Sequence, residues 1–258
     1  AMIGVALEES PTLKIHHLTH DITPYNIFEG SYRLFQTVNY WPAGTTFVSV
    51  VDPGVGSKRK SVVAKTKKGQ YIVTPDNGTL SFIKKHVGIE AIREISEVEN
   101  RRKDTEHSYT FHGRDVYAYT GAKLASGHIS FEEVGPELKV EDIVEIQVVE
   151  TTLAENYVSG AIDILDVRFG SLWTSITREE FCTLKPEFGD RFEVTIYNND
   201  MLVYQNQVTY GKSFADVRIG QPILYINSLY RVGLAINQGS FAKAYNVGAV
   251  SYTHLRAH

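Results

Sequence analysis

The first half of the chain alternates between helical and strand spacing of its hydrophobic residues. Helices are predicted at residues 1–9, 27–40, 79–87 and 115–126, and strands at 13–19, 45–51, 61–65 and 70–74. The helix at 27–40 has the clearest pattern, because it combines an apolar stripe with a capping pair, Asn26 and Glu29, at its start. This alternation predicts a three-layer α/β domain with a mostly parallel sheet over residues 1–140.

The chain begins within this alternation. A helix at 1–9 that is stopped by Pro11 and followed by a strand at 13–19 corresponds to the back half of a β-α-β unit. We therefore expect that the first strand of the sheet is missing from this chain.

The pattern changes after Glu137, where short strand-like runs replace the alternation. Strands are predicted at 143–149, 157–167, 192–197, 201–210 and 222–227. Residues 198–200 are typical of a hairpin turn, and Thr177 with Glu180 caps a short helix. We predict a second, smaller domain at 145–250, an antiparallel β-barrel. Residues 251–258 fit no element, and we interpret them as a non-native tail.

Composition narrows the class of protein. The chain has 258 residues, 43% of them hydrophobic, which is enough for one large or two modest domains. A net charge of -4 argues against a nucleic-acid binder that relies on bulk electrostatics. The single cysteine, Cys182, cannot form an internal disulfide, and this is typical of a cytoplasmic protein. No apolar run reaches the ~18 residues needed to span a membrane.

A carboxylate and a glycine-rich loop follow the predicted strand at 45–51. Asp52 comes directly after this strand and is followed by Gly54 and Gly56. Open α/β sheets bind ligands at the carboxyl edge of their strands, which makes Asp52 a candidate site residue. An aspartate that merely shapes a turn before Pro53 explains the segment equally well. The glycines match neither the P-loop nor the dinucleotide-binding fingerprint.

Two further segments have polar residues next to a predicted helix or turn. His112 lies just before a predicted helix, where an imidazole can titrate near neutrality or donate a hydrogen bond. Asp115 is more simply the N-cap of that helix. Asp166, three residues before Phe169, serves either a ligand or a turn.

The histidines of segment 16–20 do not predict a metal site. Neighbouring residues of a strand point to opposite faces of the sheet, so His16 and His17 would not converge on one ion. The spacing matches no zinc signature either, and we expect these histidines to have structural roles and the chain to hold no metal.

Together these segments resemble the S-adenosyl-L-methionine (SAM) hydroxide adenosyltransferases, a family of adenosine-forming SAM hydrolases related to fluorinating and chlorinating SAM halogenases. The resemblance covers residues 1–250 and rests on five motifs in register: His20–Pro24, Val51–Gly56, Pro75–Gly78, Phe111–Asp115 and Phe169–Thr174. It implies an α/β domain joined to a smaller β-barrel domain in a homotrimer. It also implies that SAM, as substrate and not cofactor, binds between the first domain of one subunit and the second domain of its neighbour.

The resemblance also assigns roles to individual residues. The family's catalytic Asp, Arg and His fall on Asp52, Arg59 and His112. Halogenases carry an aromatic or small residue where Asp52 stands, so this position points to the hydroxide branch. The implied substrate contacts are Tyr25 (near the sugar), Phe111, Gly113, Asp166 (for the methionine amino group), Phe169, Ser171, Phe214, Ser228 and Asn237.

Three departures from the family pattern concern substrate binding. Ser171 replaces an asparagine of many relatives, and Leu229 replaces an arginine of the halogenases. The ribose-binding aspartate of the family belongs to the strand that we expect to be missing.

The resemblance therefore implies hydrolysis of SAM to adenosine and L-methionine by in-line attack of water on the ribose C5′. A cation such as Arg59 beside Asp52 makes that carboxylate a weaker base, so we expect His112 to accept the proton and the other two residues to hold the water. Two alternatives stay open: a SAM- or nucleoside-binding module without turnover, and a SAM-dependent halogenase such as a chlorinase.

Overall fold

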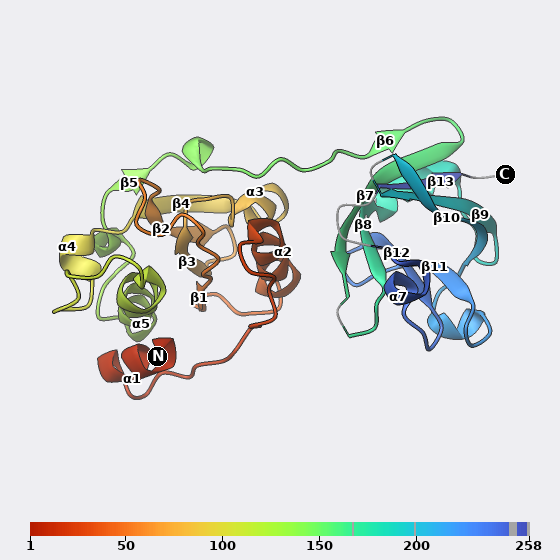
Figure 1. Cartoon of the computed structure of the whole chain (residues 1–258). Helices are drawn as coiled ribbons and strands as arrows, with labels where there is room; N and C mark the ends of the chain where they lie inside the picture. Colours follow the sequence, from red (N-terminus) through yellow and green to blue (C-terminus); the bar gives the residue numbers. More distant parts are fainter. Residues whose placement is uncertain (167, 199, 248–251, 257–258) are drawn as a thin grey trace. The chain divides into compact units, whose positions relative to one another are not determined.

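The computed structural model describes residues 1–166, 168–198, 200–247 and 252–256. The chain divides into two compact units, Ala1–Gln147 and Val148–His258 (Figure 1). Among the described helices, none has the length and apolar character that crossing a membrane would require.

The first unit contains a mixed sheet of five strands in the order β1-β3-β2-β4-β5. The strands are β1 (Thr46–Val48), β2 (Ser61–Thr66), β3 (Tyr71–Pro75), β4 (Ile89–Glu94) and β5 (Glu137–Leu138). Only β1 and β3 pair in parallel, and the other three pairings are antiparallel. The prediction of a mostly parallel sheet is therefore wrong. The reason is the short connection from β2 to β3, because a turn at residues 67–70 leaves no room for a crossover helix.

Helices cover both faces of this sheet, which gives the three predicted layers (Figure 1). The helices are α1 (Met2–Glu9), α2 (Ile27–Val38), α3 (Ser81–His86), α4 (Glu97–Asn100) and α5 (Tyr119–Ser126). On one side Phe82 of α3 packs against Tyr32 and Phe35 of α2. On the other side Leu124 of α5 belongs to a cluster with Val73 of β3.

The helix predictions are confirmed and one strand prediction of this unit is wrong. Asn26 caps α2 through its side chain, as predicted, and Gly127 ends α5 in the left-handed conformation. Residues 13–19 form no strand. Both Ile15 and Leu18 are exposed, so the apolar side chains of this segment do not pack into a core as those of a half-buried strand would. Strand β4 was not predicted.

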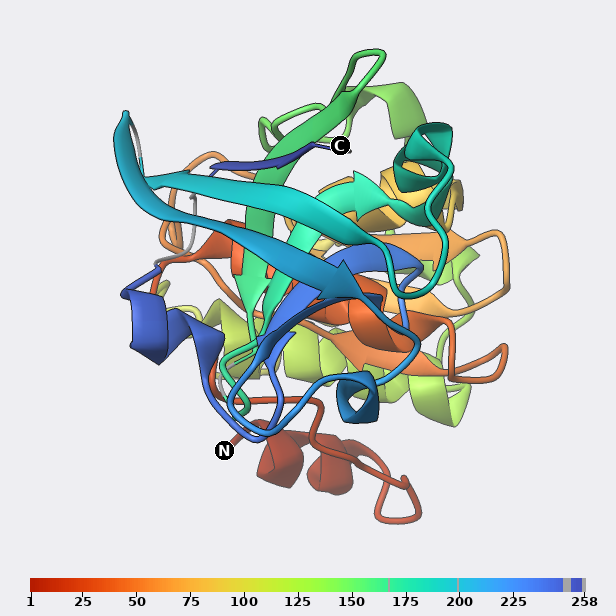
Figure 2. The same ribbon diagram turned by 90° about the vertical axis from the view of Figure 1, so that its right-hand side faces the viewer.

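The second unit is built on a curled half-barrel of seven strands. These are β6 (Thr152–Leu153), β7 (Tyr157–Leu165), β8 (Leu172–Thr177), β9 (Arg191–Asn198), β10 (Met201–Tyr210), β11 (Pro222–Ile226) and β12 (Arg231–Ile236). Together with β13 (Tyr252–Arg256) they form one sheet in the order β13-β9-β10-β11-β12-β8-β7-β6, and Figure 2 shows the curl of the sheet. All pairings are antiparallel except β10–β11, so the half-barrel differs from the predicted antiparallel barrel by one parallel pair, and β13 pairs with both β9 and β7.

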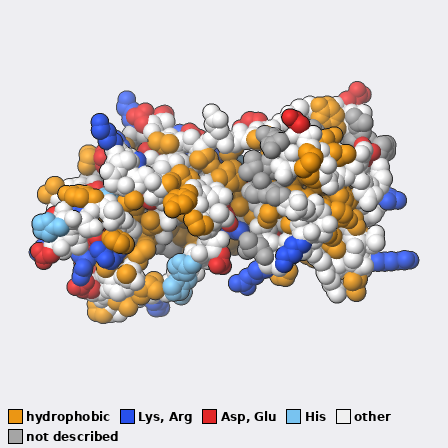
Figure 3. Space-filling model, in the orientation of Figure 1, with side chains coloured by type: hydrophobic (Ala, Val, Ile, Leu, Met, Phe, Trp, Pro, Cys, Tyr) orange, Lys and Arg blue, Asp and Glu red, His pale blue; other side chains and the backbone are white. Residues whose placement is uncertain are grey.

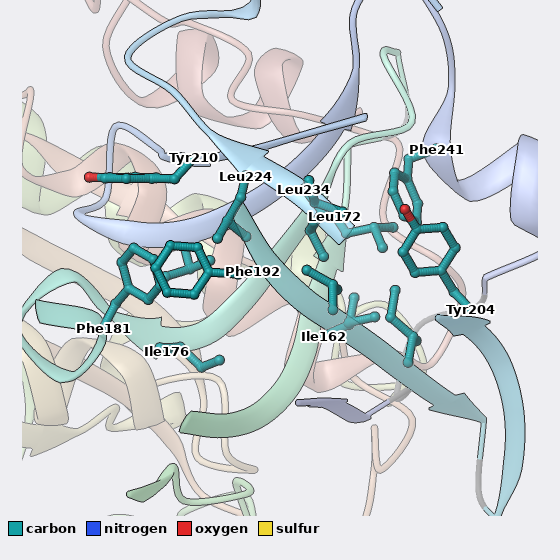
Figure 4. Packing of buried hydrophobic residues seen from close by; sticks show 14 of the residues in the cluster. Ile162, Leu172, Ile176, Phe181, Phe192, Tyr204, Tyr210, Leu224, Leu234 and Phe241 are labelled. Carbon is teal, nitrogen blue, oxygen red and sulfur yellow. The ribbon is translucent and has the colours of Figure 1, made fainter. Parts of the chain in front are cut away.

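The core of the second unit lies inside this curl. Phe181 of α6 (Arg178–Phe181) contacts Phe192, and Tyr204 contacts Phe241 of α7 (Phe241–Tyr245) (Figure 4). Phe181 and Phe241 are completely buried, and each such side chain contributes about 1.5–3 kcal/mol relative to an exposed one. The capping box predicted for Thr177 and Glu180 is present at the start of α6.

Three predictions for the second half differ from the structure. Residues 143–149 form no strand; their backbone is instead held by side chains such as Asp76, which accepts a hydrogen bond from Val144 N. Strand β7 ends at Leu165, while residue 167 of the predicted strand lies outside the described residues. Tyr252–Arg256, predicted to form no element, is strand β13, which pairs with β7 and β9. Residues 251, 257 and 258 are outside the described part.

Candidate active site

A buried ion pair lies in the loop that follows β1, a strand that ends at Val48 and not at residue 51 as predicted. Asp52 Oδ1 accepts a hydrogen bond from Arg59 Nε at 2.9 Å, and Oδ2 accepts one from Nη2 at 2.5 Å. Only 5% of the Asp52 side chain and 10% of the Arg59 side chain are exposed. Gly56, with a φ of +77°, allows the intervening loop to turn back and bring Arg59 to the carboxylate. The Asp52 residue therefore begins the turn before Pro53, and its carboxylate also forms an ion pair.

Tyr117, from the segment Gly113–Ala118, joins this pair. Its phenol oxygen lies 3.1 Å from Ser61 Oγ, which accepts a hydrogen bond from Arg59 Nη1 at 3.1 Å. Tyr117 Oη also donates to Asp52 Oδ2 at 3.5 Å. Burial raises the pKa of the Tyr117 phenol well above its ordinary value, so this group keeps its proton and donates a hydrogen bond at neutral pH.

The guanidinium of Arg59 is held in its charged form. Burial by itself lowers the pKa of Arg59, but the hydrogen bond to Asp52 and the nearby acidic groups outweigh burial and raise it. The pair therefore presents a permanent positive charge beside a carboxylate, both turned away from bulk solvent.

His112 is the third member of this group. Its side chain is 4% exposed, and its ring centroid lies 6.4 Å from that of Tyr117. Arg59 Cζ lies 5.8 Å from the same tyrosine ring. Nε2 of His112 is 3.3 Å from Glu97 Oε1, whereas Nδ1 is buried and has no hydrogen-bond partner among the described residues. The three predicted catalytic side chains are thus gathered around Tyr117, which we call the Tyr117 group: Asp52, Arg59, Ser61, His112 and Tyr117.

A π-helical segment, Gly113–Ala118, explains why His112 and Tyr117 face each other. In a π-helix, residues five apart lie one above the other, and these two residues are five apart. The predicted N-cap role of Asp115 is wrong. Asp115 is completely buried, and its carboxylate accepts hydrogen bonds from Arg114 Nε at 2.6 Å and Nη2 at 2.8 Å.

The second unit has its own buried tyrosine, Tyr225 of β11. Its hydroxyl accepts a hydrogen bond from Trp173 Nε1 at 3.2 Å, and its ring lies 5.1 Å from that of Phe214. Burial raises the pKa of Tyr225, and hydrogen bonds with Trp173 and Ser171 only partly oppose this. Gly233 of β12 leaves room for the ring, because a Cβ there would lie 2.7 Å from Tyr225 Cζ. We call these residues, with the nearby Asp166, the Tyr225 group.

The predicted turn role of Asp166 is present. Its Oδ1 accepts hydrogen bonds from the backbone N–H groups of Arg168 at 3.1 Å and Phe169 at 3.2 Å. This holds a loop in which the Phe169 side chain is 70% exposed. Asp166 and the exposed Phe169 ring therefore belong to one loop, which the Asp166 carboxylate holds in place.

The other residues that were predicted to contact the substrate lie outside the Tyr117 and Tyr225 groups. Tyr25, with a φ of +69°, and Phe111 are exposed, and Phe111 packs against Arg114. Ser228 is exposed, and Asn237 uses its amide to donate to the Val217 carbonyl at 2.9 Å. Large exposed hydrophobic side chains of this kind occur on both units (Figure 3).

Sequence reasoning missed several members of the two groups. Tyr117 could have been suspected from its distance of five residues after His112. Ser61 stands two residues after Arg59 and thus shares its side of an extended segment. Glu97 and Tyr225 have no local signal, because only the tertiary fold brings them to their partners.

The histidines near the N-terminus are not arranged as a metal site. His17 Nδ1 lies 2.6 Å from His20 Nε2, and both side chains are exposed. Within the described residues, no group of three or more His, Cys, Asp or Glu side chains is placed to hold a metal ion.

Comparison with known proteins finds a match over both units. Residues 1–135 match the model of the SAM hydroxide adenosyltransferase N-terminal domain, and residues 160–251 match that of the C-terminal domain. An (R)-S-adenosyl-L-methionine hydrolase of Thermus thermophilus is 30% identical over 93% of this chain and 87% of that protein. A fluorinase of an Actinoplanes species is 29% identical over 95% of this chain and 88% of that protein.

Two further similarities differ in extent. An (R)-S-adenosyl-L-methionine hydrolase of Methanocaldococcus jannaschii is 39% identical, over 55% of this chain and 52% of that protein. The crystal structure of an uncharacterized conserved protein from Thermotoga maritima superposes with a TM-score of 0.91 and 30% identity, over 99% of this chain and 93% of that one.

Proposed function

This chain belongs to the SAM hydroxide adenosyltransferase family, and we propose that it hydrolyses SAM to adenosine and L-methionine. In this reaction a water oxygen forms a bond to the ribose C5′ while the C5′–sulfur bond breaks. Sulfur keeps the bonding electron pair and leaves as the neutral thioether of methionine, and the water loses one proton. The leaving group needs no acid, so the enzyme has to align the water and accept its proton.

The observation that carries this proposal is that the buried pair of Asp52 and Arg59 and the buried His112 all lie next to Tyr117. The bidentate contact fixes both side chains, so a water bound to them would have a fixed position. In-line positioning contributes the most to such a displacement, and a general base adds about 10²–10⁴ in rate. We propose that the pair holds the water opposite the carbon–sulfur bond.

We propose His112 as the proton acceptor. Both oxygens of Asp52 already accept hydrogen bonds from Arg59, so this carboxylate is engaged in the ion pair. His112 Nδ1, by contrast, is buried without a partner among the described residues. His112→Gln should lower the rate of adenosine formation by about 10²–10⁴. An unchanged rate would assign the base role to Asp52.

The charge of Asp52 favours water over a halide ion. A chloride about 4 Å from a carboxylate is repelled by about 4 kcal/mol at an effective dielectric constant near 20. Arg59 offsets part of this repulsion, but uncharged water experiences none of it. We therefore expect wild-type protein to prefer hydrolysis, and Asp52→Ala to admit some chloride, detectable as chloroadenosine by mass spectrometry.

The second candidate is halide transfer, which the similarity to fluorinases over 95% of the chain favours. One experiment separates the candidates: purified protein is incubated with SAM in chloride or fluoride buffer, and the products are chromatographed. Adenosine with methionine supports the hydrolase, and a halogenated adenosine supports halide transfer. Calorimetric binding without any product would mean that the protein is a binding module.

For the substrate we propose contacts from both groups of residues. The sulfonium cation is favoured by aromatic and carboxylate neighbours, which Phe169 and Asp166 supply. The other proposed contacts are Tyr25, Phe111, Gly113, Ser171, Phe214, Ser228 and Asn237.

We also propose that the protein is a homotrimer with its sites between subunits. Mixed trimers of Asp52→Ala and Asp166→Ala should then recover part of the activity that each variant lacks. If light scattering shows a monomer, or the mixture stays inactive, the shared site is wrong.

A further inference from the structure

Helix α4 places beside His112 a carboxylate that has no role in the reaction proposed above. Glu97, its first residue, has Oε1 3.3 Å from His112 Nε2. Its other oxygen, Oε2, accepts a hydrogen bond from Arg101 Nη1 at 2.7 Å. The Glu97 carboxylate therefore lies between a permanent cation and an imidazole, with one oxygen for each.

Arg101 is itself fixed, which prevents Glu97 from turning away. The Arg101 guanidinium is nearly buried and donates to the carbonyl oxygens of Thr105 at 3.3 Å and Ser108 at 2.6 Å. It also lies 4.8 Å from the Tyr109 ring centroid. These contacts anchor the loop leading to His112 on α4, so loop, cation and carboxylate form one support for the imidazole.

A carboxylate accepts hydrogen bonds and cannot donate them when ionised. The imidazole nitrogen that faces it is therefore the one that carries the proton, and the other nitrogen of a neutral histidine then has a free lone pair. In His112 the protonated nitrogen would be Nε2, and the free one is the buried Nδ1 that has no partner among the described residues.

We propose that Glu97 is a positioning residue that fixes the tautomer of His112, so that Nδ1 is the atom that accepts the proton of the attacking water. This inference rests on the proposed hydrolysis for its catalytic meaning, but the tautomer itself does not depend on turnover. As the water proton reaches Nδ1, the carboxylate also stabilises the positive imidazolium, much as a buried aspartate does in serine proteases.

The experiment measures the tautomer directly in the full-length protein. Protein labelled with ¹⁵N-histidine is studied by long-range ¹H–¹⁵N correlation spectra, with His112 assigned through the His112→Gln variant. We expect Nε2 of His112 to be protonated and Nδ1 to be unprotonated. In Glu97→Gln the amide can face the ring with either its oxygen or its nitrogen, and the other tautomer should become populated.

Kinetics provide the second readout. Glu97→Gln should lower kcat on the order of 10- to 100-fold with KM changed by no more than about twofold, because the interaction matters to proton transfer and not to binding. Glu97→Asp keeps the charge and should keep the wild-type tautomer. Glu99→Gln is the matched control: it removes an exposed carboxylate from the same helix and should change neither readout.

The proposal is overturned if wild-type His112 carries its proton on Nδ1, or if Glu97→Gln leaves both tautomer and kcat unchanged. The wild-type spectrum decides the first point even if the variants fold poorly. Absence of adenosine from wild-type protein would instead refute the proposed function, and the spectrum would still decide whether Glu97 orients His112.

Discussion

The two units each surround one buried tyrosine, but with different chemistry. Tyr117 lies among an ion pair, a serine and a histidine, so its surroundings are charged and hydrogen-bonded. Tyr225 lies among a tryptophan and a phenylalanine and is fitted against a glycine, so its surroundings are aromatic and tightly packed. The first arrangement suits the control of a nucleophile and a proton, and the second suits the shape of a ligand.

This comparison predicts that charge removal damages the first unit more than the second. Asp52→Ala leaves Arg59 buried without its partner, which should lower the free energy of unfolding by about 3–5 kcal/mol and abolish adenosine formation. Asp166→Ala removes two hydrogen bonds in an open loop and should cost about 1 kcal/mol. Urea unfolding of both variants checks the difference, and equal losses would contradict it.

Changes in side-chain packing should destabilise the second unit more than the first. In Gly233→Ala the new methyl group overlaps the Tyr225 ring, and the shift that this forces should cost about 1–3 kcal/mol. Calorimetric melting measures the loss. In the double variant Gly233→Ala/Tyr225→Leu the two effects should not add, because the smaller side chain relieves the overlap. Additive losses would show that the ring is not the source of strain.

Loss of the Tyr117 hydroxyl is a smaller test of the first unit. Tyr117→Phe keeps the ring but removes the contacts to Ser61 and Asp52, and should lower the free energy of unfolding by about 0.5–1.5 kcal/mol. The proposed hydrolysis of SAM should slow as well, because the ion pair that we propose to hold the water loses a support. Tyr40→Phe, at an exposed tyrosine, is the control and should be neutral. Equal stability of the two variants would mean that the phenol contributes nothing.

The smallest effect concerns pH. Burial raises the pKa of Asp76, although its hydrogen bond from Val144 opposes this. A carboxyl group whose pKa is higher in the folded than in the unfolded state contributes stability at low pH, and this contribution disappears as the pH rises through the folded value. Asp76→Asn should therefore slightly increase stability at neutral pH and remove the gain on acidification. Unfolding curves at pH 4 and pH 7 test both points, and a loss at pH 7 would contradict them.

Local patterns were sufficient where an element meets its partner over a short stretch of chain. Helix α2 has a complete apolar stripe and a cap within its own twelve residues, so it lay within reach of the sequence. The prediction of a strand at 13–19 is wrong because an alternating pattern does not specify whether a neighbouring strand exists. The prediction of a mostly parallel sheet is wrong because the length of one turn, and not the strand pattern, determines the direction of β3.

The candidate site could be predicted only in part, for the same reason. The resemblance located Asp52, Arg59 and His112, and the fold brings them around one tyrosine. Ser61 and Tyr117 are 56 residues apart, and Trp173 and Tyr225 are 52 apart. Such contacts depend on the packing of whole layers, which no local window of sequence contains.

The π-helical segment Gly113–Ala118 makes the site sensitive to how this stretch is wound. Its wide turn accommodates one residue more than an ordinary helical turn. Ordinary α-helical winding of the same residues would place His112 and Tyr117 about 140° apart around the helix axis, although every side chain of the group would still be encoded.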